Sequence, residues 1–253
     1  MEKMYKNFEI VITPDYESLS RRAAEIIAAQ ITAKPDSVLG LATGSTPIGT
    51  YRNLVSMYKE NKIDFAKVTT FNLDEYHPIK KSDRQSYIHF MKDNLFNHVN
   101  IPPENAHIQS GEAEDVHGEC VQYERLIENA GGIDLQLLGL GHNGHLGFNE
   151  PDDIFPQSTH YVALDESTIT ANSRMFDSID DVPRHAITMG IGTIMQAEQI
   201  LILISGTGKA EIAEKIIFGD ITPKVPGSVL QLHRSVTVIL DADAAEAVAK
   251  HLR

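Results

Sequence analysis

A loop rich in glycine and in titratable side chains follows one of the apolar stretches of this chain. It reads LGLGHNGHLGFNEP and runs from Leu138 to Pro151. The apolar run before it, residues 133–140, is typical of a buried strand, and open α/β sheets bind ligands beyond the carboxyl ends of their strands. His145 and Glu150 share this tight loop. We therefore predict a reaction centre here, in preference to a glycine-rich turn whose polar groups only satisfy their own backbone.

Two adjacent carboxylates follow a second strand-like run. The stretch Phe71–Pro78 reads FNLDEYHP and contains Asp74 and Glu75. Neighbouring residues of an extended chain point to opposite sides, so we expect only one of the two to face a ligand. A carboxylate held in a dry site is able to act as a base towards a carbon acid. The spacing does not choose between Asp74 and Glu75, and a solvated acidic turn is the alternative.

A third segment, LATGST at residues 41–46, ends a strand and precedes Pro47. Proline is common at the first position of a helix, and the backbone N–H groups of Gly44, Ser45 and Thr46 are placed to form an anion-binding nest there. It is not a Walker A loop, because no Gly-Lys-Ser/Thr follows. A plain turn with a Ser/Thr cap is the alternative.

Two cations are candidates for an anion site. Lys209 closes the sequence GTGK after the most hydrophobic strand-like run, at the start of a helix, where the helix dipole does not favour a cation. Arg174 follows Asn172 and Ser173, and its guanidinium is able to grip a phosphate through two hydrogen bonds. A surface lysine and an ion-paired arginine remain alternative interpretations.

Composition narrows the possible partners. The formal net charge is −13 and no block is rich in Lys or Arg, which argues against nucleic acid and anionic membranes as partners. Any phosphate site must then be built locally from backbone N–H groups and a few cations. The single cysteine, Cys120, is interpreted as an inert packing residue and suits a reducing compartment. No apolar run is long enough for a membrane helix and no secretory signal is visible, so a cytoplasmic protein is expected.

Metal binding is not favoured. His77, His142, His145 and Glu150 are the candidate ligands, but the two histidines of the glycine-rich loop are not spaced as on a helix. Neither an HExxH nor a CxxC pattern occurs.

The elements that must position these residues alternate between strands and helices. Strands are predicted at Ser37–Thr43, Lys67–Leu73, Ile133–Leu140, His185–Met189, Gln199–Ser205 and Ser235–Leu240. Helices are predicted after a Thr13 cap with Pro14 as first residue, at Pro47–Lys59, at Glu119–Asn129 and at Lys209–Phe218. The alternation favours parallel βαβ units, and hence one α/β domain over residues 1–253 with a mostly parallel sheet between two layers of helices.

Taken together, LATGSTP, FNLDEY, GHNGHLGFNEP, the ANSR segment and GTGK resemble the motifs of glucosamine-6-phosphate deaminases, in the same order and at similar spacing. The resemblance extends from about residue 8 to residue 240. It implies a Rossmann-like fold shared with 6-phosphogluconolactonases. It also implies conversion of glucosamine 6-phosphate and water to fructose 6-phosphate and ammonia, without metal or organic cofactor, by a monomer or homo-oligomer.

The resemblance assigns roles by position. His145 opens the sugar ring, with Glu150 behind it, and Asp74, not Glu75, removes the C2 proton. The expected substrate-binding residues are Thr43, Gly44, Ser45, Thr46, Arg174 and Lys209. Many family members have Asp where this chain has Asn143. The substitution removes a negative charge beside His145, and we expect it to make that imidazole less basic. We expect Asn143 only to position a hydroxyl, while ring opening relies on the His145–Glu150 pair.

A second departure concerns regulation. Some oligomeric relatives are activated by N-acetylglucosamine 6-phosphate through basic residues shortly after the FNEP motif, but Asp152–Leu164 contains no Lys or Arg. The sequence therefore predicts hyperbolic kinetics without this activation.

Three other functions stay open. A galactosamine-6-phosphate deaminase needs the same residues, a 6-phosphogluconolactonase has no obvious need of Asp74, and a sensor without catalysis needs neither Asp74 nor His145.

Overall fold

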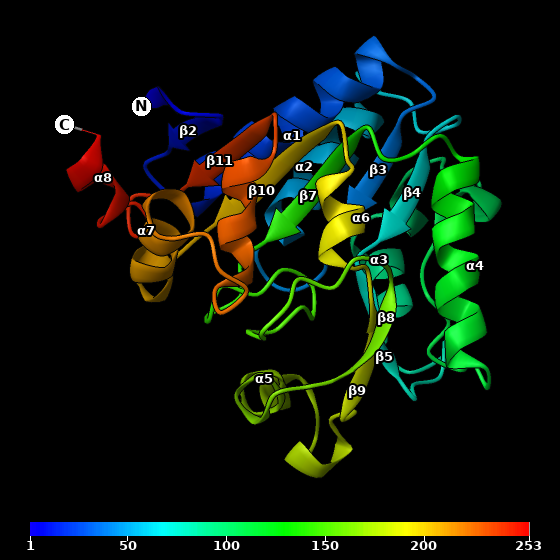
Figure 1. Cartoon of the computed structure of the whole chain (residues 1–253). Helices are drawn as coiled ribbons and strands as arrows, with labels where there is room; N and C mark the ends of the chain where they lie inside the picture. The colour runs from blue at the N-terminus through cyan, green and yellow to red at the C-terminus, as the bar shows by residue number, and fades with distance from the viewer. Residues whose placement is uncertain (253) are drawn as a thin grey trace.

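A large, mostly parallel sheet forms the centre of the molecule (Figure 1). The computed structural model describes residues 1–252. In spatial order the eight strands are β1 (Glu2–Tyr5), β2 (Phe8–Ile12), β11 (Val236–Leu240), β10 (Gln199–Ile204), β7 (Leu135–Gly139), β3 (Val38–Leu41), β4 (Thr69–Asn72) and β6 (Ala106–His107). Only β1 runs antiparallel to its neighbour. The predicted α/β class with a mostly parallel sheet is confirmed.

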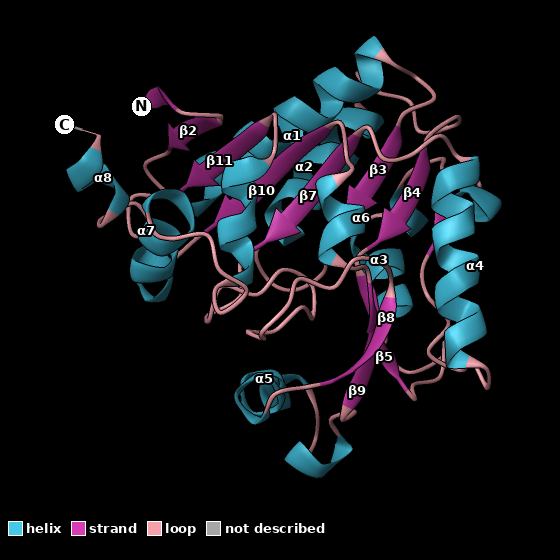
Figure 2. Cartoon of the chain, in the orientation of Figure 1, coloured by secondary structure: helices cyan, strands magenta, loops and turns pink. Residues whose placement is uncertain are grey.

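Helices cover both faces of this sheet, which gives three layers (Figure 2). In that view α1 and α2 lie behind the strands, whereas α4, α6 and α7 lie in front of them. The helices are α1 (Tyr16–Ala33), α2 (Ile48–Lys59), α3 (Tyr87–Asn94), α4 (Val116–Asn129), α5 (Glu166–Asn172), α6 (Ile191–Met195), α7 (Ala210–Phe218) and α8 (Val248–His251). Short 3-10 turns occur at Phe96–His98, Pro103–Asn105, Ser173–Met175, Ile179–Asp181, Thr207–Lys209 and Pro226–Leu232. No helix among residues 1–252 combines the length and the apolar character needed to cross a membrane.

The predicted helix starts need correction. Thr13 is not a cap, because its N–H and its hydroxyl both bind the carbonyl of Leu240 in the neighbouring strand. Asp15 caps α1 instead, accepting from the N–H of Ser18 at 2.7 Å. Pro47 occupies the cap position of α2 and is not its first helical residue.

Two further helix starts differ from the prediction. Asp115 caps α4, which begins three residues before Glu119. Lys209 ends a 3-10 turn that leads into α7, so it precedes that α-helix.

A second, smaller sheet was not expected. Its strands are β5 (Asp74–His77), β9 (His185–Thr188) and β8 (His160–Ala163), and all of them pair antiparallel. The predicted strand at His185–Met189 therefore exists but lies outside the parallel sheet. The FNLDEYHP run crosses from one sheet to the other at Leu73, whose N–H binds Leu41 and whose carbonyl binds Met189.

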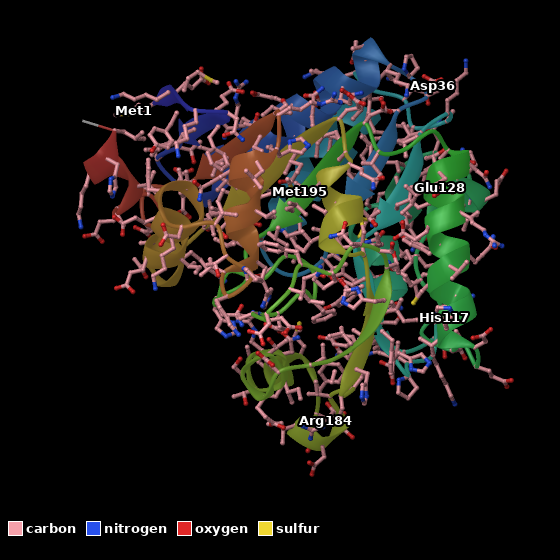
Figure 3. The ribbon with its side chains drawn as sticks, in the orientation of Figure 1. Met1, Asp36, His117, Glu128, Arg184 and Met195 are labelled. Atoms are coloured by element: carbon pink, nitrogen blue, oxygen red, sulfur yellow. The ribbon has the colours of Figure 1, made fainter. Side chains whose placement is uncertain are left out.

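The second sheet extends from the carboxyl-end side of the first. Figure 3 places Arg184, at the far end of the small sheet, opposite Asp36, which precedes β3. Its apolar face has its own core, made of Tyr76, Ile79, Phe148, Leu164, Ile169, Val182 and Ala186. Phe148 comes from the glycine-rich loop and Ile169 from α5, so this core holds the loop, the sheet and α5 together.

Candidate active site

The predicted site segments follow four neighbouring strands of the main sheet. Residues 43–46 follow β3, Asp74 follows β4, the glycine-rich loop follows β7, and residues 206–209 follow β10. The chain builds the sheet from β3 towards β6 and then returns to β7, so the order reverses between β3 and β7. Loops on the two sides of such a switch point diverge and leave room for a ligand.

The glycine-rich loop brings His145 and Glu150 together. The Nδ1 atom of His145 lies 3.0 Å from Glu150 Oε2, and the two side chains are 16% and 7% exposed. A carboxylate only accepts hydrogen bonds, so this contact assigns the proton to Nδ1 and leaves Nε2 free as an acceptor. Gly141 allows the close packing, because a Cβ there would come within 2.0 Å of the imidazole.

Three side chains hold the Glu150 carboxylate. Oε2 accepts from His145 and also from Asn143 Nδ2 at 2.7 Å, whereas Oε1 accepts from the hydroxyl of Thr168. Burial alone would raise the pKa of Glu150, but these hydrogen bonds, and the charge that the imidazole carries when it is protonated, hold that pKa at about 2. Glu150 is therefore ionised throughout the neutral range. Asn143 binds this carboxylate, which differs from the expectation that it only positions a hydroxyl.

Asp74 and Glu75 are both buried but differ in their partners. Glu75 accepts the backbone N–H groups of Tyr76, Tyr87 and Ile88, and the last two open α3. Glu75 therefore stabilises a helix start. Among the described residues Asp74 has no hydrogen-bond partner for its carboxylate; burial, and next the charge of Glu75, raise its pKa to about 8. Asp74 is therefore the candidate base of the two, a choice that the spacing alone did not make.

Asp74 faces the glycine-rich loop at Gly147. A Cβ on Gly147 would lie 3.1 Å from Asp74 Oδ2 and 2.8 Å from Thr188 Oγ1. Thr188 pairs with Asp74 across the small sheet, and its hydroxyl accepts the N–H of Phe148 at 3.1 Å. The candidate base and the imidazole loop are therefore joined through one strand of the second sheet.

The loop after β3 has free backbone donors. Gly44 has a φ of +93°, and within residues 1–252 the N–H groups of Gly44, Ser45 and Thr46 have no partner. The carbonyls of Ser45 and Thr46 are bound by the Tyr16 hydroxyl, which fixes the loop. Free N–H groups ahead of α2 are suited to binding an anion.

Lys209 and Arg174 lie near one another. Burial, and next the charge of Arg174, lower the pKa of Lys209. In the part of the chain that the structure describes neither cation forms a salt bridge, and Lys209 Nζ donates to the Leu140 carbonyl at 2.8 Å. Two close cations without an acidic partner are stabilised by an anionic ligand.

Sequence reasoning missed two residues of this region. Thr168 binds Glu150, and Tyr76 receives a hydrogen bond from Asn172 Nδ2 at 2.8 Å. Thr168 belongs to no recognisable pattern, because it lies 18 residues after its partner in a polar stretch. Tyr76 ends the FNLDEY motif, but nothing in the motif indicated this contact. Over residues 1–252 no group of three or more His, Cys, Asp or Glu side chains is arranged to hold a metal ion.

The fold and these loops define a Rossmann-like α/β enzyme whose titratable groups gather at the carboxyl end of its parallel sheet. The family model described as "Glucosamine-6-phosphate isomerases/6-phosphogluconolactonase" matches residues 15–239. The chain belongs to this family, as the sequence predicted.

Relatives of the chain agree with this assignment. A glucosamine-6-phosphate deaminase of Clostridioides difficile is 56% identical over 236 residues, which are 93% of this chain and 95% of the relative. One from a Thermoanaerobacter strain is 55% identical over 240 residues, 95% of each chain.

Solved structures extend the comparison to the fold. A monomeric glucosamine-6-phosphate deaminase superimposes with a TM-score of 0.92 at 47% identity, covering 94% of this chain and 99% of the other. A 6-phosphogluconolactonase from Leishmania guyanensis reaches a TM-score of 0.73 at 21% identity, covering 94% and 98% of the two chains. That similarity concerns the fold alone.

Proposed function

We propose that this protein is a glucosamine-6-phosphate deaminase, which converts glucosamine 6-phosphate and water to fructose 6-phosphate and ammonia. The observation that carries the proposal is the combination of a buried Asp74, without a hydrogen-bond partner among residues 1–252, with a His145–Glu150 pair in the loop that packs against it at Gly147. An isomerisation needs a base for a carbon acid, and ring opening needs a separate group that moves a proton between oxygens. Relatives of this name at 56% and 55% identity support the assignment.

Ring opening is assigned to His145. Its Nε2 atom, free of the contact to Glu150, takes the proton from the O1 hydroxyl of the sugar and returns one to O5. The C1–O5 bond breaks and a C1 aldehyde forms. Glu150 stays ionised and holds the imidazole in the tautomer that this step requires.

The isomerisation is assigned to Asp74. Its carboxylate removes the proton from C2 of the open-chain amino aldehyde while O1 takes a proton from water, which gives an enolamine, and the Asp74 carboxyl then returns a proton to C1. The resulting C2 iminium adds water and loses ammonia, which leaves the C2 ketone of fructose 6-phosphate. A carboxyl whose pKa lies near neutral pH suits a group that first accepts and then donates a proton.

The phosphate is assigned to the loop after β3 and to the two close cations. The N–H groups of Gly44, Ser45 and Thr46 would donate to it, together with Arg174 and Lys209, and Thr43 would contact the substrate beside them. Holding the phosphate at a distance from the reacting carbons orients C1 and C2 towards the base. We further propose that the enzyme acts as a monomer, in line with the monomeric deaminase of similar structure, and that it works in the cytoplasm.

The test is a two-product assay on the purified protein. Glucosamine 6-phosphate should yield ammonia and fructose 6-phosphate in equal amounts, at an unchanged rate in EDTA. Parallel reactions contain galactosamine 6-phosphate and 6-phosphogluconolactone. Faster turnover of the galacto epimer would change the substrate but keep the mechanism. Hydrolysis of the lactone alone would remove the role of Asp74, and binding of the sugar phosphate without turnover would indicate a sensor.

A further inference from the structure

Thr168 is a buried polar residue that the reaction described above does not use. It lies on α5 with 3% of its surface exposed, and its hydroxyl donates to Glu150 Oε1. Glu150 belongs to the loop after β7, 18 residues earlier. The hydrogen bond therefore joins two elements that are separate in the sequence.

The two oxygens of Glu150 have different partners. Oε2 accepts from His145 and Asn143, and both donors come from the same loop as Glu150 itself. Among residues 1–252 the Oε1 atom accepts only from Thr168. Without that donor the carboxylate would be held along one edge and would be able to rotate about its Cγ–Cδ bond. Because such a rotation moves Oε2, it also releases the Nδ1 atom of His145.

The same face of α5 carries a second anchor. Asn172 lies four residues after Thr168, one helical turn on, and donates to the Tyr76 hydroxyl at 2.8 Å. Tyr76 is on β5, two residues after Asp74. Thus α5 contacts both the strand that starts with the proposed base and the carboxylate behind the imidazole. In Figure 1 this helix lies below the carboxyl ends of the main sheet.

The end of α5 leads directly to Arg174, in the turn Ser173–Met175. A substrate phosphate that binds Arg174 would therefore affect the position of α5, the helix that also contacts Glu150 and Tyr76. The hydrogen bond from the Thr168 hydroxyl to Glu150 is the contact by which a change in the position of α5 would affect the His145–Glu150 pair.

We propose that Thr168 is a positioning residue for ring opening, which fixes the Glu150 carboxylate so that His145 keeps its tautomer and direction, and which links this pair to the phosphate-binding end of α5. The proposal rests on the deaminase function proposed above. Thr168 touches no reacting atom and acts through Glu150.

The first test is kinetic and uses matched variants. Thr168→Val keeps the shape of the side chain and removes the donor, Thr168→Ser keeps the donor, and Thr170→Val is a control at an exposed position of the same helix. A hydrogen bond to a charged group predicts a fall in kcat of about 10- to 100-fold for T168V, with KM changed by less than about threefold. T168S and T170V should stay within about threefold of the wild-type kcat.

A double-variant cycle separates positioning from general packing. If Thr168 acts through Glu150, T168V should cost little further rate in a protein that already carries Glu150→Gln. Independent, additive losses in the two variants would overturn the proposal, and so would an unchanged kcat in T168V. A loss in T168V that T168S does not rescue would also count against it.

The second test does not depend on turnover. In protein labelled with ¹⁵N-histidine, the Nδ1 proton of His145 is assigned by its absence in His145→Gln. This resonance should shift or broaden in T168V and stay in place in T168S and T170V. An identical resonance in T168V would refute the positioning role even if the wild type fails to deaminate glucosamine 6-phosphate. That failure alone would refute the proposed function and leave the spectroscopic result to decide on Thr168.

Discussion

At the scale of single residues, the adjacent carboxyls of Asp74 and Glu75 differ in role: Glu75 stabilises a helix start, and Asp74 is the candidate base. Both side chains are at most 5% exposed, and burial raises the pKa of both. Three backbone N–H groups act in the opposite direction on Glu75, whereas none is bound to Asp74. Hydrogen bonds rather than depth of burial therefore distinguish the helix-capping carboxylate from the candidate base.

The candidate base predicts the pH dependence of the reaction. Asp74 has to be ionised to accept the C2 proton, and its pKa is raised to about 8. The value of kcat/KM should therefore rise with pH up to about pH 8, and Asp74→Asn should lower kcat by about 10²- to 10⁴-fold. Initial rates between pH 5 and pH 9 check this. A flat profile across that range, or an active D74N protein, would exclude Asp74 as the base.

The same carboxyl affects stability with a defined sign. Its pKa is higher in the folded protein than in the unfolded chain, where it is about 4. Protonation therefore favours the folded state: the contribution is complete below about pH 4 and is lost as the pH rises to about 8. Relative to wild type, D74N should gain about 4 kcal/mol of unfolding free energy between pH 5 and pH 8.5, because the shift is worth about 1.4 kcal/mol for each pH unit between the two pKa values. Urea denaturation of both proteins at the two pH values measures this change. If the difference in unfolding free energy between D74N and wild type were the same at pH 5 and pH 8.5, the raised pKa would be contradicted.

Glu150 belongs to the ring-opening pair and Asn143 donates to its carboxylate, but the two residues should contribute unequally. Glu150→Gln removes the charge that holds the Nδ1 proton of His145, and we expect kcat to fall by about 10²-fold or more. Asn143→Ala removes one of three donors to that carboxylate and should cost about tenfold or less. Steady-state kinetics of both variants compare the losses. Equal losses would mean that Asn143 shares in the proton transfer.

At the scale of elements, the glycine-rich loop is shaped by close approaches that only glycine permits. Gly147 has a φ of +59° and lies against Asp74, the first residue of β5, and Thr188, the last residue of the paired strand β9. The loop between β7 and β8 is thereby held against the small sheet. This contact sets the distance between the element that carries the imidazole and the element that carries the base.

Gly147→Ala tests this contact. The new Cβ would come within 2.8 Å of Thr188 Oγ1 in a left-handed backbone conformation, so we expect a loss of about 2 kcal/mol in unfolding free energy. The kcat value should fall as well, because Asp74 is displaced. Gly139→Ala is the control, since its Cβ would meet no atom within 4 Å. Thermal unfolding and steady-state kinetics of both variants are the measurements. If G147A had the same stability and the same kcat as G139A, the tight contact would be refuted.

At the scale of the whole molecule, a chain of net charge −13 places two interacting cations, Arg174 and Lys209, where the proposed phosphate site lies. Long-range attraction for an anionic substrate is thus weak, and binding depends on local donors. Residues 152–164 likewise offer little attraction for an anion, because they contain no Lys or Arg. The lysine that approaches this segment, Lys224, contacts Asp153 at 2.7 Å.

We therefore expect hyperbolic kinetics and no activation by N-acetylglucosamine 6-phosphate. A regulator that carries a phosphate would find Lys224 already paired with an acidic group. Substrate saturation curves with and without this sugar phosphate, together with sedimentation of the enzyme, check the regulation and the monomer. A sigmoidal curve that becomes hyperbolic on its addition, or a stable oligomer, would contradict this expectation.

Much of this arrangement could be predicted from the sequence. The runs at 37–43, 67–73, 133–140, 199–205 and 235–240 all contain strands of the parallel sheet, and all four predicted helices exist with starts shifted by up to three residues. The candidate residues at strand ends were also visible, because apolar periodicity and glycine-rich turns are local signals. The strands β1, β2, β5, β6 and β8 were missed. All but β2 have four residues or fewer, a pattern too brief to distinguish from loops.

The sequence by itself determined the chemical groups and the order in which they follow the strands of an α/β protein. Only the tertiary structure decided that Asp74 opens a second sheet, that Glu75 binds the first N–H groups of α3, and that Thr168 holds Glu150. Local side-chain patterns specify which face of an element is buried. Contacts across 12 to 114 residues depend instead on how the whole chain packs, as in the pairing of Asp74 with Thr188.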